Sequence, residues 1–255
     1  MKIFLAPCRI GFKSSQKLAN VLGARRIKLH ESRYRHRSNF RVVNWGRSDV
    51  AFPVALNQPE AVAKAINKRS TWDILASRGI PTVCHTIDPT VAQGWLDSGV
   101  SVYRRETLTA FGGRGLSCIR RGGSLPLPLF SETGGVFTPD ITYTKRFPTR
   151  REFRVLVVGN EVALVSEKKK RRGSNPDPMI RSHEGYVFCR HDLEPYPSRI
   201  CDDSIAAIQA LGLDFGGVDI AVDKNDNTCV LEVNTAPGID GESVPALAGA
   251  LLRLL

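Results

Sequence analysis

The sequence predicts an α/β protein, and three observations support this fold class. An apolar segment at residues 2–6, a helical pattern ending at Gly23 and a second apolar segment at residues 26–29 follow one another, as in a small open α/β unit. Strand-like segments begin again at Val100. Near the end of the chain, in residues 217–238, a polar turn joins two strand-like runs as in a hairpin.

Length and composition bound the function classes. The 255 residues can form two or three packed units, and an apolar content of 42% indicates a globular chain rather than a disordered one. No run approaches the roughly 18 apolar residues of a membrane span, and the apolar start is too short for a signal peptide. The net charge of +11 suits any polyanion, from a nucleotide to an acidic peptide or a nucleic acid.

The cysteines are scattered and contain no C-x-x-C pair. Neither a zinc site nor a disulfide framework is therefore expected, and a reducing compartment such as the cytoplasm is predicted. The six positions are Cys8, Cys84, Cys118, Cys189, Cys201 and Cys229.

The first 58 residues are predicted to form a separate small α/β domain that ends near Pro53–Pro59. Ser14 or Ser15 is the expected cap of its helix. Its third strand ends at Trp45, which lies where open α/β sheets bind ligands or else covers the core. The basic loop Arg33–Arg41 is either solvated or in contact with an acidic substrate. A lone Gly11 excludes a dinucleotide fingerprint here.

Two features in the middle of the chain suit phosphate groups. Lys68 lies at a predicted helix start, where a phosphate finds backbone donors, although a lone lysine there is normally only surface charge. Arg104 and Arg105 end a strand and precede the glycine-rich turn 109–116. Its glycines let backbone N–H groups approach phosphate oxygens, but many hairpins carry similar glycines. These glycines are Gly112, Gly113 and Gly115.

The late hairpin carries the strongest chemical signal. Glu232 and Asn234 are two residues apart on one strand, so both side chains point to the same face. If the strands pair in register, Asp219 faces them. Three oxygen ligands on one face suit Mg²⁺ that bridges phosphates. The alternative is a solvated sheet face, but both residues interrupt an apolar run, and buried carboxylates need partners.

The region between these motifs is strand-rich and basic. Strands are expected from Ile141 onward, and the run Lys168–Arg172 is either solvated or a nucleic-acid patch. Arg181 and His183 follow a Pro-rich loop, and a lone histidine is more often a structural hydrogen-bonder than a catalyst.

The ordered set of motifs resembles the ATP-grasp superfamily, over about residues 40–242. The similarity is greatest to its bacteriophage branch of carboxylate–amine ligases, which is related to the ribosomal-protein glutamate ligases. The resemblance rests on Asn67-Lys68, Arg105 before Gly112-Gly113-Arg114-Gly115, Glu152-Phe153-Arg154-Val155, Arg181-Ser182-His183, Gly217-Val218-Asp219 and Leu231-Glu232-Val233-Asn234-Thr235-Ala236-Pro237-Gly238.

The resemblance implies two α+β lobes that clamp ATP, at residues 59–140 and 141–255, after the small domain at 1–58. It also implies a role for each matched position. Nucleotide binding falls on Lys68, Arg105, Gly112, Gly113, Gly115, Tyr143, Thr144 and Lys145. Contact with the transferred phosphoryl group falls on Arg154, Lys168 and Arg181. Magnesium, or manganese in its place, falls on Asp219, Glu232 and Asn234.

Two departures from the family pattern affect the nucleotide site. The second phosphate-binding position is usually lysine, and here it is Arg105 with Arg104 beside it, so the sequence leaves open which arginine serves. The inter-lobe hinge, commonly acidic where it meets the ribose, carries Lys145 and Arg146. The choice of nucleotide is therefore less constrained than phosphate binding.

The implied function is ATP-dependent amide formation between a carboxylate and an amine through an acyl phosphate, in the cytoplasm of a cell or of a phage host. The substrates would be an amino acid, peptide or protein carboxylate and an amine. No membrane partner is expected, and nucleic acid is a less favoured partner. Two alternatives remain open at this point. One is a basic nucleic-acid-binding or virion protein without turnover, and the other is an ATP-grasp kinase.

Overall fold

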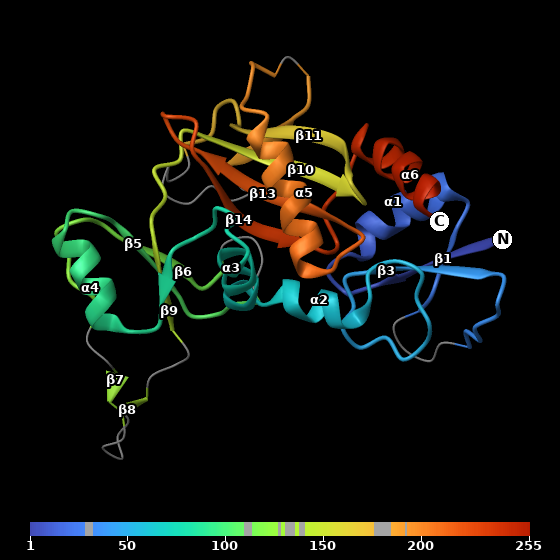
Figure 1. The fold of residues 1–255 in the computed structure, drawn as a ribbon, viewed down its shortest axis with the longest axis horizontal. Coiled ribbons are helices and arrows are strands. Elements are labelled where there is room, and N and C mark those ends of the chain that lie inside the picture. Colours follow the sequence, from blue (N-terminus) through green and yellow to red (C-terminus); the bar gives the residue numbers. More distant parts are fainter. Residues whose placement is uncertain are drawn as a thin grey trace.

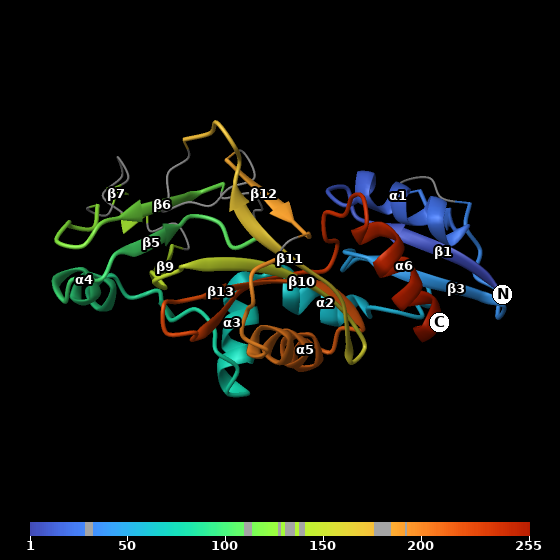
Figure 2. The same ribbon diagram turned by 90° about the horizontal axis from the view of Figure 1, so that it is seen from above.

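The computed structural model describes residues 1–28, 33–109, 114–126, 129–130, 136–137, 141–175, 185–191 and 193–255. Three packed parts lie along the longest axis, with the N-terminal unit at one end, a large sheet in the middle and a small sheet at the other end (Figure 1). Both termini lie at the end of the molecule formed by the N-terminal unit (Figure 2). Within the described ranges no helix is long and apolar enough to cross a membrane.

The N-terminal unit is a three-stranded parallel sheet in the order β2-β1-β3 with one helix. Its elements are β1 (Lys2–Pro7), α1 (Phe12–Leu22), β2 (Arg25–Arg26) and β3 (Phe40–Trp45). The predicted serine caps are wrong, because α1 begins at Phe12 after Gly11. Ser14 and Ser15 lie inside its first turn and donate back to the carbonyls of Gly11 and Phe12. Strand β2 is also shorter than predicted.

The large sheet has five strands, all antiparallel to their neighbours, in the order β12-β11-β10-β13-β14. They are β10 (Arg151–Val158), β11 (Glu161–Lys170), β12 (Tyr186–Cys189), β13 (Phe215–Val222) and β14 (Thr228–Asn234). Alternate residues of β10, such as Phe153 and Val155, form one apolar face. Helices α5 (Arg199–Leu211), α2 (Pro59–Ile66) and α3 (Lys68–Ser77) cover that face.

The small sheet has four strands in the order β4-β9-β5-β6. They are β4 (His85–Thr86), β5 (Val102–Arg105), β6 (Leu116–Ile119) and β9 (Thr142–Lys145), with α4 (Pro89–Asp97) packed on one face. A separate two-stranded pair consists of β7 (Leu129–Phe130) and β8 (Val136–Phe137).

This packing differs in two places from the lobe boundaries expected at residues 59–140 and 141–255. Strand β9 completes the small sheet, because it pairs with β4 on one side and β5 on the other. Helices α2 and α3 pack on the large sheet instead of the small one. Apolar patterns in the sequence predict the helices and strands, whereas tertiary packing decides which sheet each apolar face contacts.

The opposite face of the large sheet joins the N-terminal unit through a second core. Helix α6 (Ser243–Leu254) lies against α1, and Leu156 and Phe215 of the sheet pack with Leu5 and Trp45. Trp45 is fully buried, and its Nε1 donates to Ser14 Oγ at 3.1 Å. Its ring stacks on that of Phe215, with 5.5 Å between the ring centroids. The interpretation of Trp45 as a core residue is confirmed.

Asn57 fastens the segment after the N-terminal unit to the start of β13. Its N–H donates to Asp214 Oδ2 at 2.5 Å and its Nδ2 donates to the Phe215 carbonyl at 3.1 Å. Its Oδ1 accepts from the N–H groups of Asp214 and Phe215 at 2.8 and 3.2 Å. Asn57 is fully buried and has a φ of +59°, a left-handed conformation that asparagine tolerates better than most residues.

Replacing Asn57 tests this connection. Asn57→Ala removes three side-chain hydrogen bonds in a buried place and puts alanine at a positive φ, so the free energy of unfolding should fall by about 3 kcal/mol. Urea denaturation measures the change. The control is Asp226→Ala, at φ +62° in an exposed turn, with an expected loss of about 1 kcal/mol. Equal losses at the two positions would contradict the role of the hydrogen bonds.

Candidate nucleotide and metal site

The predicted metal ligands lie on one face of the large sheet because strand β14 is bulged. From the turn of the hairpin to the pair Ile220–Val230, β13 and β14 keep one regular register. The register then shifts by one residue, so that Asp219 pairs with Glu232 and Gly217 with Asn234. Without the shift Asp219 would face Leu231, and Glu232 would point to the opposite face of the sheet.

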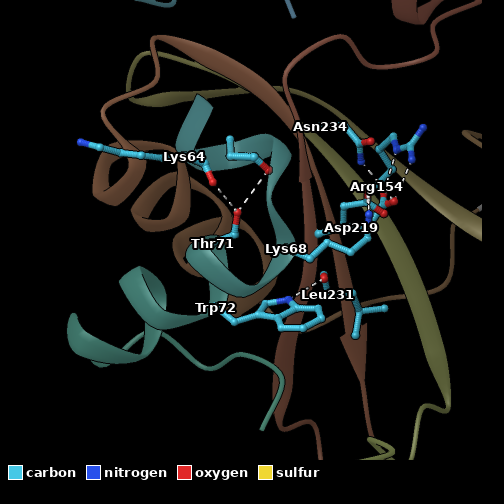
Figure 3. A network of polar contacts seen from close by, with 10 residues as sticks. Lys64, Lys68, Thr71, Trp72, Arg154, Asp219, Leu231 and Asn234 are labelled. Carbon is cyan, nitrogen blue, oxygen red and sulfur yellow. Dashed lines mark hydrogen bonds and ion pairs between the residues drawn. The ribbon is translucent and has the colours of Figure 1, made fainter. Parts of the chain in front are cut away.

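Arg154 holds Asp219 from the neighbouring strand. The two residues are direct cross-strand partners, and Arg154 Nε and Nη2 donate to the two carboxylate oxygens of Asp219 at 2.7 Å each. Asn234 Nδ2 lies 3.4 Å from Asp219 Oδ2 (Figure 3). Burial by itself raises the pKa of Asp219, but the charge and hydrogen bonds of Arg154 outweigh it and leave the pKa lowered.

Helix α3 brings a second cation to the site. It begins at Lys68, and the side chain of Asn67 caps it by accepting from the Ser70 N–H at 3.2 Å. Lys68 is 8% exposed, and its Nζ donates to Glu232 Oε1 at 2.9 Å. One turn later, Trp72 Nε1 donates to the carbonyl of Leu231, the residue at the bulge, at 3.0 Å (Figure 3). Helix α3 therefore supports both the bulge and the carboxylate.

The small sheet contributes Arg105 and leaves Arg104 outside the site. The guanidinium of Arg105 lies 5.3 Å from the ring centroid of Trp72, and its buried Nε has no hydrogen-bond partner in the described part of the chain. Burial lowers the pKa of Arg105, while the charge of Glu232 acts in the opposite direction. Arg104, the residue before Arg105 on the strand, points to the other face of the sheet and forms an ion pair with Glu106.

Two threonines on the face of Arg105 also have unsatisfied hydroxyls. Thr142 is the cross-strand partner of Arg105, and Thr144 pairs with Tyr103 two residues away, so both lie on this face. Both are fully buried, and their Oγ1 atoms have no partner among the described residues. Buried polar groups without partners are rare and often mark a ligand site. Thr142 was missed by the sequence reasoning, since a threonine in a strand carries no chemical signal.

Lys168 lies on the same face of the large sheet, one pair further along. It is the cross-strand neighbour of Glu152, and its Nζ donates to Glu152 Oε1 at 2.7 Å. Phe188 of β12 separates this pair from the Arg154 pair, with its ring centroid 4.4 Å from the Arg154 guanidinium and 5.8 Å from Lys168 Nζ. Glu152 and Phe188 were not predicted as site residues.

The remaining predicted residues divide into two groups. Gly112, Gly113 and Arg181, with His183, lie outside the described residues. Gly115 has a φ of +68°, and its carbonyl accepts from the Glu106 N–H at 2.9 Å, which closes the turn.

The strand predicted to read adenine is engaged in the small sheet. The side chain of Tyr143 packs against α4, on the face opposite Arg105, and Thr144 has strand partners on both sides. The Lys145 N–H donates to the Cys84 carbonyl, and the Arg146 N–H donates to the Ser101 carbonyl. The N–H groups of Lys145 and Arg146 are therefore already used, and adenine binding by this strand stays a prediction.

Two neighbouring carboxylates in the site are each paired with a cation. Where side chains are described, no three His, Cys, Asp or Glu residues come together in a metal-binding group. The predicted magnesium ligands are instead two carboxylates and one amide. The carboxylates form ion pairs with Arg154 and Lys68. A cation is thus already favoured at both carboxylates, and oxygen donors of this kind suit Mg²⁺.

The strength of the central ion pair can be measured with Arg154→Met. The substitution leaves Asp219 buried and unpaired, so the free energy of unfolding at pH 7 should fall by about 3 kcal/mol. Since the folded-state pKa of Asp219 is lowered, the pair stabilises the fold above the unfolded carboxyl pKa of about 3.9 and loses its effect as the pH falls. The deficit of the variant should therefore shrink between pH 7 and about pH 3.

Urea denaturation at several pH values gives this deficit. The matched control is Arg253→Met, which breaks an exposed pair with Glu161 and should cost less than about 1 kcal/mol. A deficit for Arg154→Met that does not change with pH would contradict the assignment.

Comparison with sequence relatives identifies the second half of the chain. Residues 143–247 match the family described as the RimK-like ATP-grasp domain. A probable alpha-L-glutamate ligase of Enterobacter sp. (strain 638) is 40% identical over 91 residues, which are 36% of this chain and 28% of that protein. A ribosomal protein bS6–L-glutamate ligase of Salmonella paratyphi B is 39% identical over 90 residues, which are 35% and 28% of the two chains. The match thus covers less than a third of either relative.

Solved structures extend the similarity to the whole chain. The ATP-grasp ligase PsnB, solved with a minimal precursor, aligns with 100% of this chain and 99% of its own at a TM-score of 0.66 and 14% identity. D-alanyl-alanine synthetase A from Vibrio cholerae aligns with 99% of this chain and 97% of its own at a TM-score of 0.68 and 12% identity. The chain therefore has the ATP-grasp fold, and its residues 143–247 match the RimK-like ATP-grasp domain.

Proposed function

We propose that the protein is an ATP-dependent carboxylate–amine ligase that forms an amide bond through an acyl phosphate. The observation that carries the proposal is the pair of neighbouring carboxylates Asp219 and Glu232, with Arg154 bound to the first and Lys68 of helix α3 bound to the second. The names of the relatives support it, since they are glutamate ligases. A protein that only bound nucleic acid would not need paired oxygen ligands on one buried face.

The cations suit the triphosphate of ATP. Lys68 approaches Glu232 from helix α3 and Arg105 approaches it from the small sheet, and the Nε of Arg105 has no hydrogen-bond partner among the described residues. A phosphate that takes the place of Glu232 as their partner would satisfy both. The glycine-rich turn at 112–115 would add backbone N–H groups. We assign the nucleotide to the face of the small sheet that carries Arg105, where the hydroxyls of Thr142 and Thr144 have no partner among the described residues.

Asp219, Glu232 and Asn234 would hold Mg²⁺, or Mn²⁺ in its place. These hard oxygen donors fit the ion, and the site already attracts cations to both carboxylates. When bound, the ion would neutralise negative charge on the phosphates. Arg154 and Lys68 would then have to release the carboxylates. The two cations would become available to the phosphate oxygens, and every charge would remain paired.

The chain's own residues act by positioning and charge neutralisation. The substrate carboxylate takes the γ-phosphoryl group and ADP leaves; the amine then attacks the acyl carbon, phosphate leaves, and the amine proton passes to a base. Arg154 and Lys168 would stabilise the transferred group from one face of the sheet, and Arg181 is assigned the same role. Neither step needs an enzyme nucleophile.

Location and origin also remain proposals. We place the protein in the cytoplasm, because all six cysteines are free thiols, and burial raises the pKa of Cys229 to about 12. The bacteriophage origin rests on the sequence resemblance. A kinase is the second candidate, since the phosphoryl-transfer machinery alone would serve one.

A substitution at the metal site tests the proposed chemistry. Glu232→Gln keeps the shape of the side chain but removes its charge, and should lower ADP release at least about a hundredfold while leaving the fold intact. ADP release is measured with mixtures of carboxylic acids and amines and Mg²⁺. Dependence on both acceptors supports a ligase, and dependence on the acid alone supports a kinase.

The control for this experiment is Glu161→Gln, at an exposed residue that begins β11, at the opposite end of the strand from Lys168. Its ADP release should equal that of the wild type. Unchanged turnover of the Glu232→Gln variant would remove the metal assignment, and circular dichroism excludes unfolding as the cause of a loss.

Because its own cations occupy the carboxylates, the site should bind metal and nucleotide together. Titration calorimetry should show weak binding of Mg²⁺ alone, and at least about tenfold tighter ADP binding when Mg²⁺ is present. Lys68→Met should weaken ADP binding in the presence of Mg²⁺. Tight binding of Mg²⁺ without nucleotide would show that the ion pairs do not compete with the metal.

A further inference from the structure

The positive charge of the chain is concentrated in the N-terminal unit. Residues 1–58 contain 12 of the 36 lysines and arginines but only 2 of the 25 aspartates and glutamates, a net charge of +10. Residues 59–255 together carry only +1. Buried cations of the large sheet are paired with carboxylates, whereas the described part of residues 1–58 shows one ion pair, Arg47–Asp49. This local excess creates a field that attracts polyanions.

Part of this charge lies along helix α1 beside exposed apolar groups. Lys13 and Lys17 are exposed and four residues apart, so they share one face of the helix. The Arg26 guanidinium lies 4.0 Å from the ring centroid of Phe12, which is 47% exposed. Ile10 is 63% exposed. These residues form the α1 surface, defined as Arg9, Ile10, Phe12, Lys13, Lys17 and Arg26.

The α1 surface begins next to the end of the metal-binding hairpin. Gly11 lies between its residues and packs so closely that an added Cβ would come within 2.9 Å of the Ala236 Cβ and 2.6 Å of the Trp45 ring. Ala236 follows Asn234 by two residues. The start of the α1 surface therefore lies next to the segment that follows Asn234.

We propose that the α1 surface docks an acidic polypeptide and presents its carboxylate to the site. The inference rests on the proposed function and names its substrate class. The cations of the α1 surface have no carboxylate partner among the described residues and fit acidic side chains, and Ile10 and Phe12 fit apolar ones. Nucleic acid fits less well, because Ile10 offers no aromatic face and Arg26 covers one face of Phe12.

Fluorescence anisotropy of the full chain tests the docking without nucleotide. The probe is a labelled peptide of alternating glutamate and leucine with a free carboxy terminus. It should bind, and more weakly as salt rises from about 50 to about 200 mM. Lys13→Glu/Lys17→Glu should weaken binding about tenfold. The matched control, Lys64→Glu/Lys224→Glu, makes the same charge change at exposed positions elsewhere and should alter affinity less than about twofold.

Three outcomes would overturn the proposal. The first is an equal loss of peptide affinity in both double variants. The second is tighter binding of a single-stranded oligonucleotide than of the peptide, and the third is no peptide binding at low salt.

Failure of the ligase proposal is separable from failure of the docking proposal. Peptide binding that depends on Lys13 and Lys17 supports docking even if no mixture releases ADP. ADP release with small acids but no binding of the peptide overturns docking alone. If the peptide is a substrate, Lys13→Glu/Lys17→Glu should raise its KM about tenfold and leave kcat and the KM for ATP unchanged.

Discussion

The structure depends on keeping every buried charge paired on one face of the large sheet. Desolvating a lone carboxylate or guanidinium costs several kcal/mol, so each of these groups must have an opposite charge within hydrogen-bond distance. Arg154 and Lys68 meet this requirement for Asp219 and Glu232. In the proposed function the same groups would exchange partners, because a phosphate would replace each carboxylate and a metal ion would replace each cation.

The bulge in β14 and helix α3 make this arrangement possible. One extra residue in the strand turns Glu232 to the face of Asp219, and the indole of Trp72 holds the carbonyl at the bulge. The same helix begins with Lys68, the cation that Glu232 accepts from. Position and charge are thus fixed by a single short helix, and that helix packs on the large sheet with α2 and α5 (Figure 1).

The N-terminal unit is joined to this site structurally but differs from it electrostatically. A shared core around Trp45 and the hydrogen bonds of Asn57 hold the unit against the large sheet. Its cations, in contrast, lie mostly at the surface and lack carboxylate partners where they are described. Paired charges suit a closed site that handles phosphates, and unpaired ones suit a surface that attracts a partner.

The sequence by itself determined the elements and most of the chemistry. Alternating apolar residues predicted the strands of the hairpin, and the residue types at 219, 232 and 234 predicted oxygen ligands. It did not determine which face each ligand occupies, because the bulge that aligns them has no sequence signature and depends on Trp72, about 160 residues away in the chain. Tertiary packing also decided that Trp45 is a core residue, that α2 and α3 cover the large sheet, and that Arg105 rather than Arg104 faces the site. Each of these depends on contacts between distant segments, which local patterns do not encode.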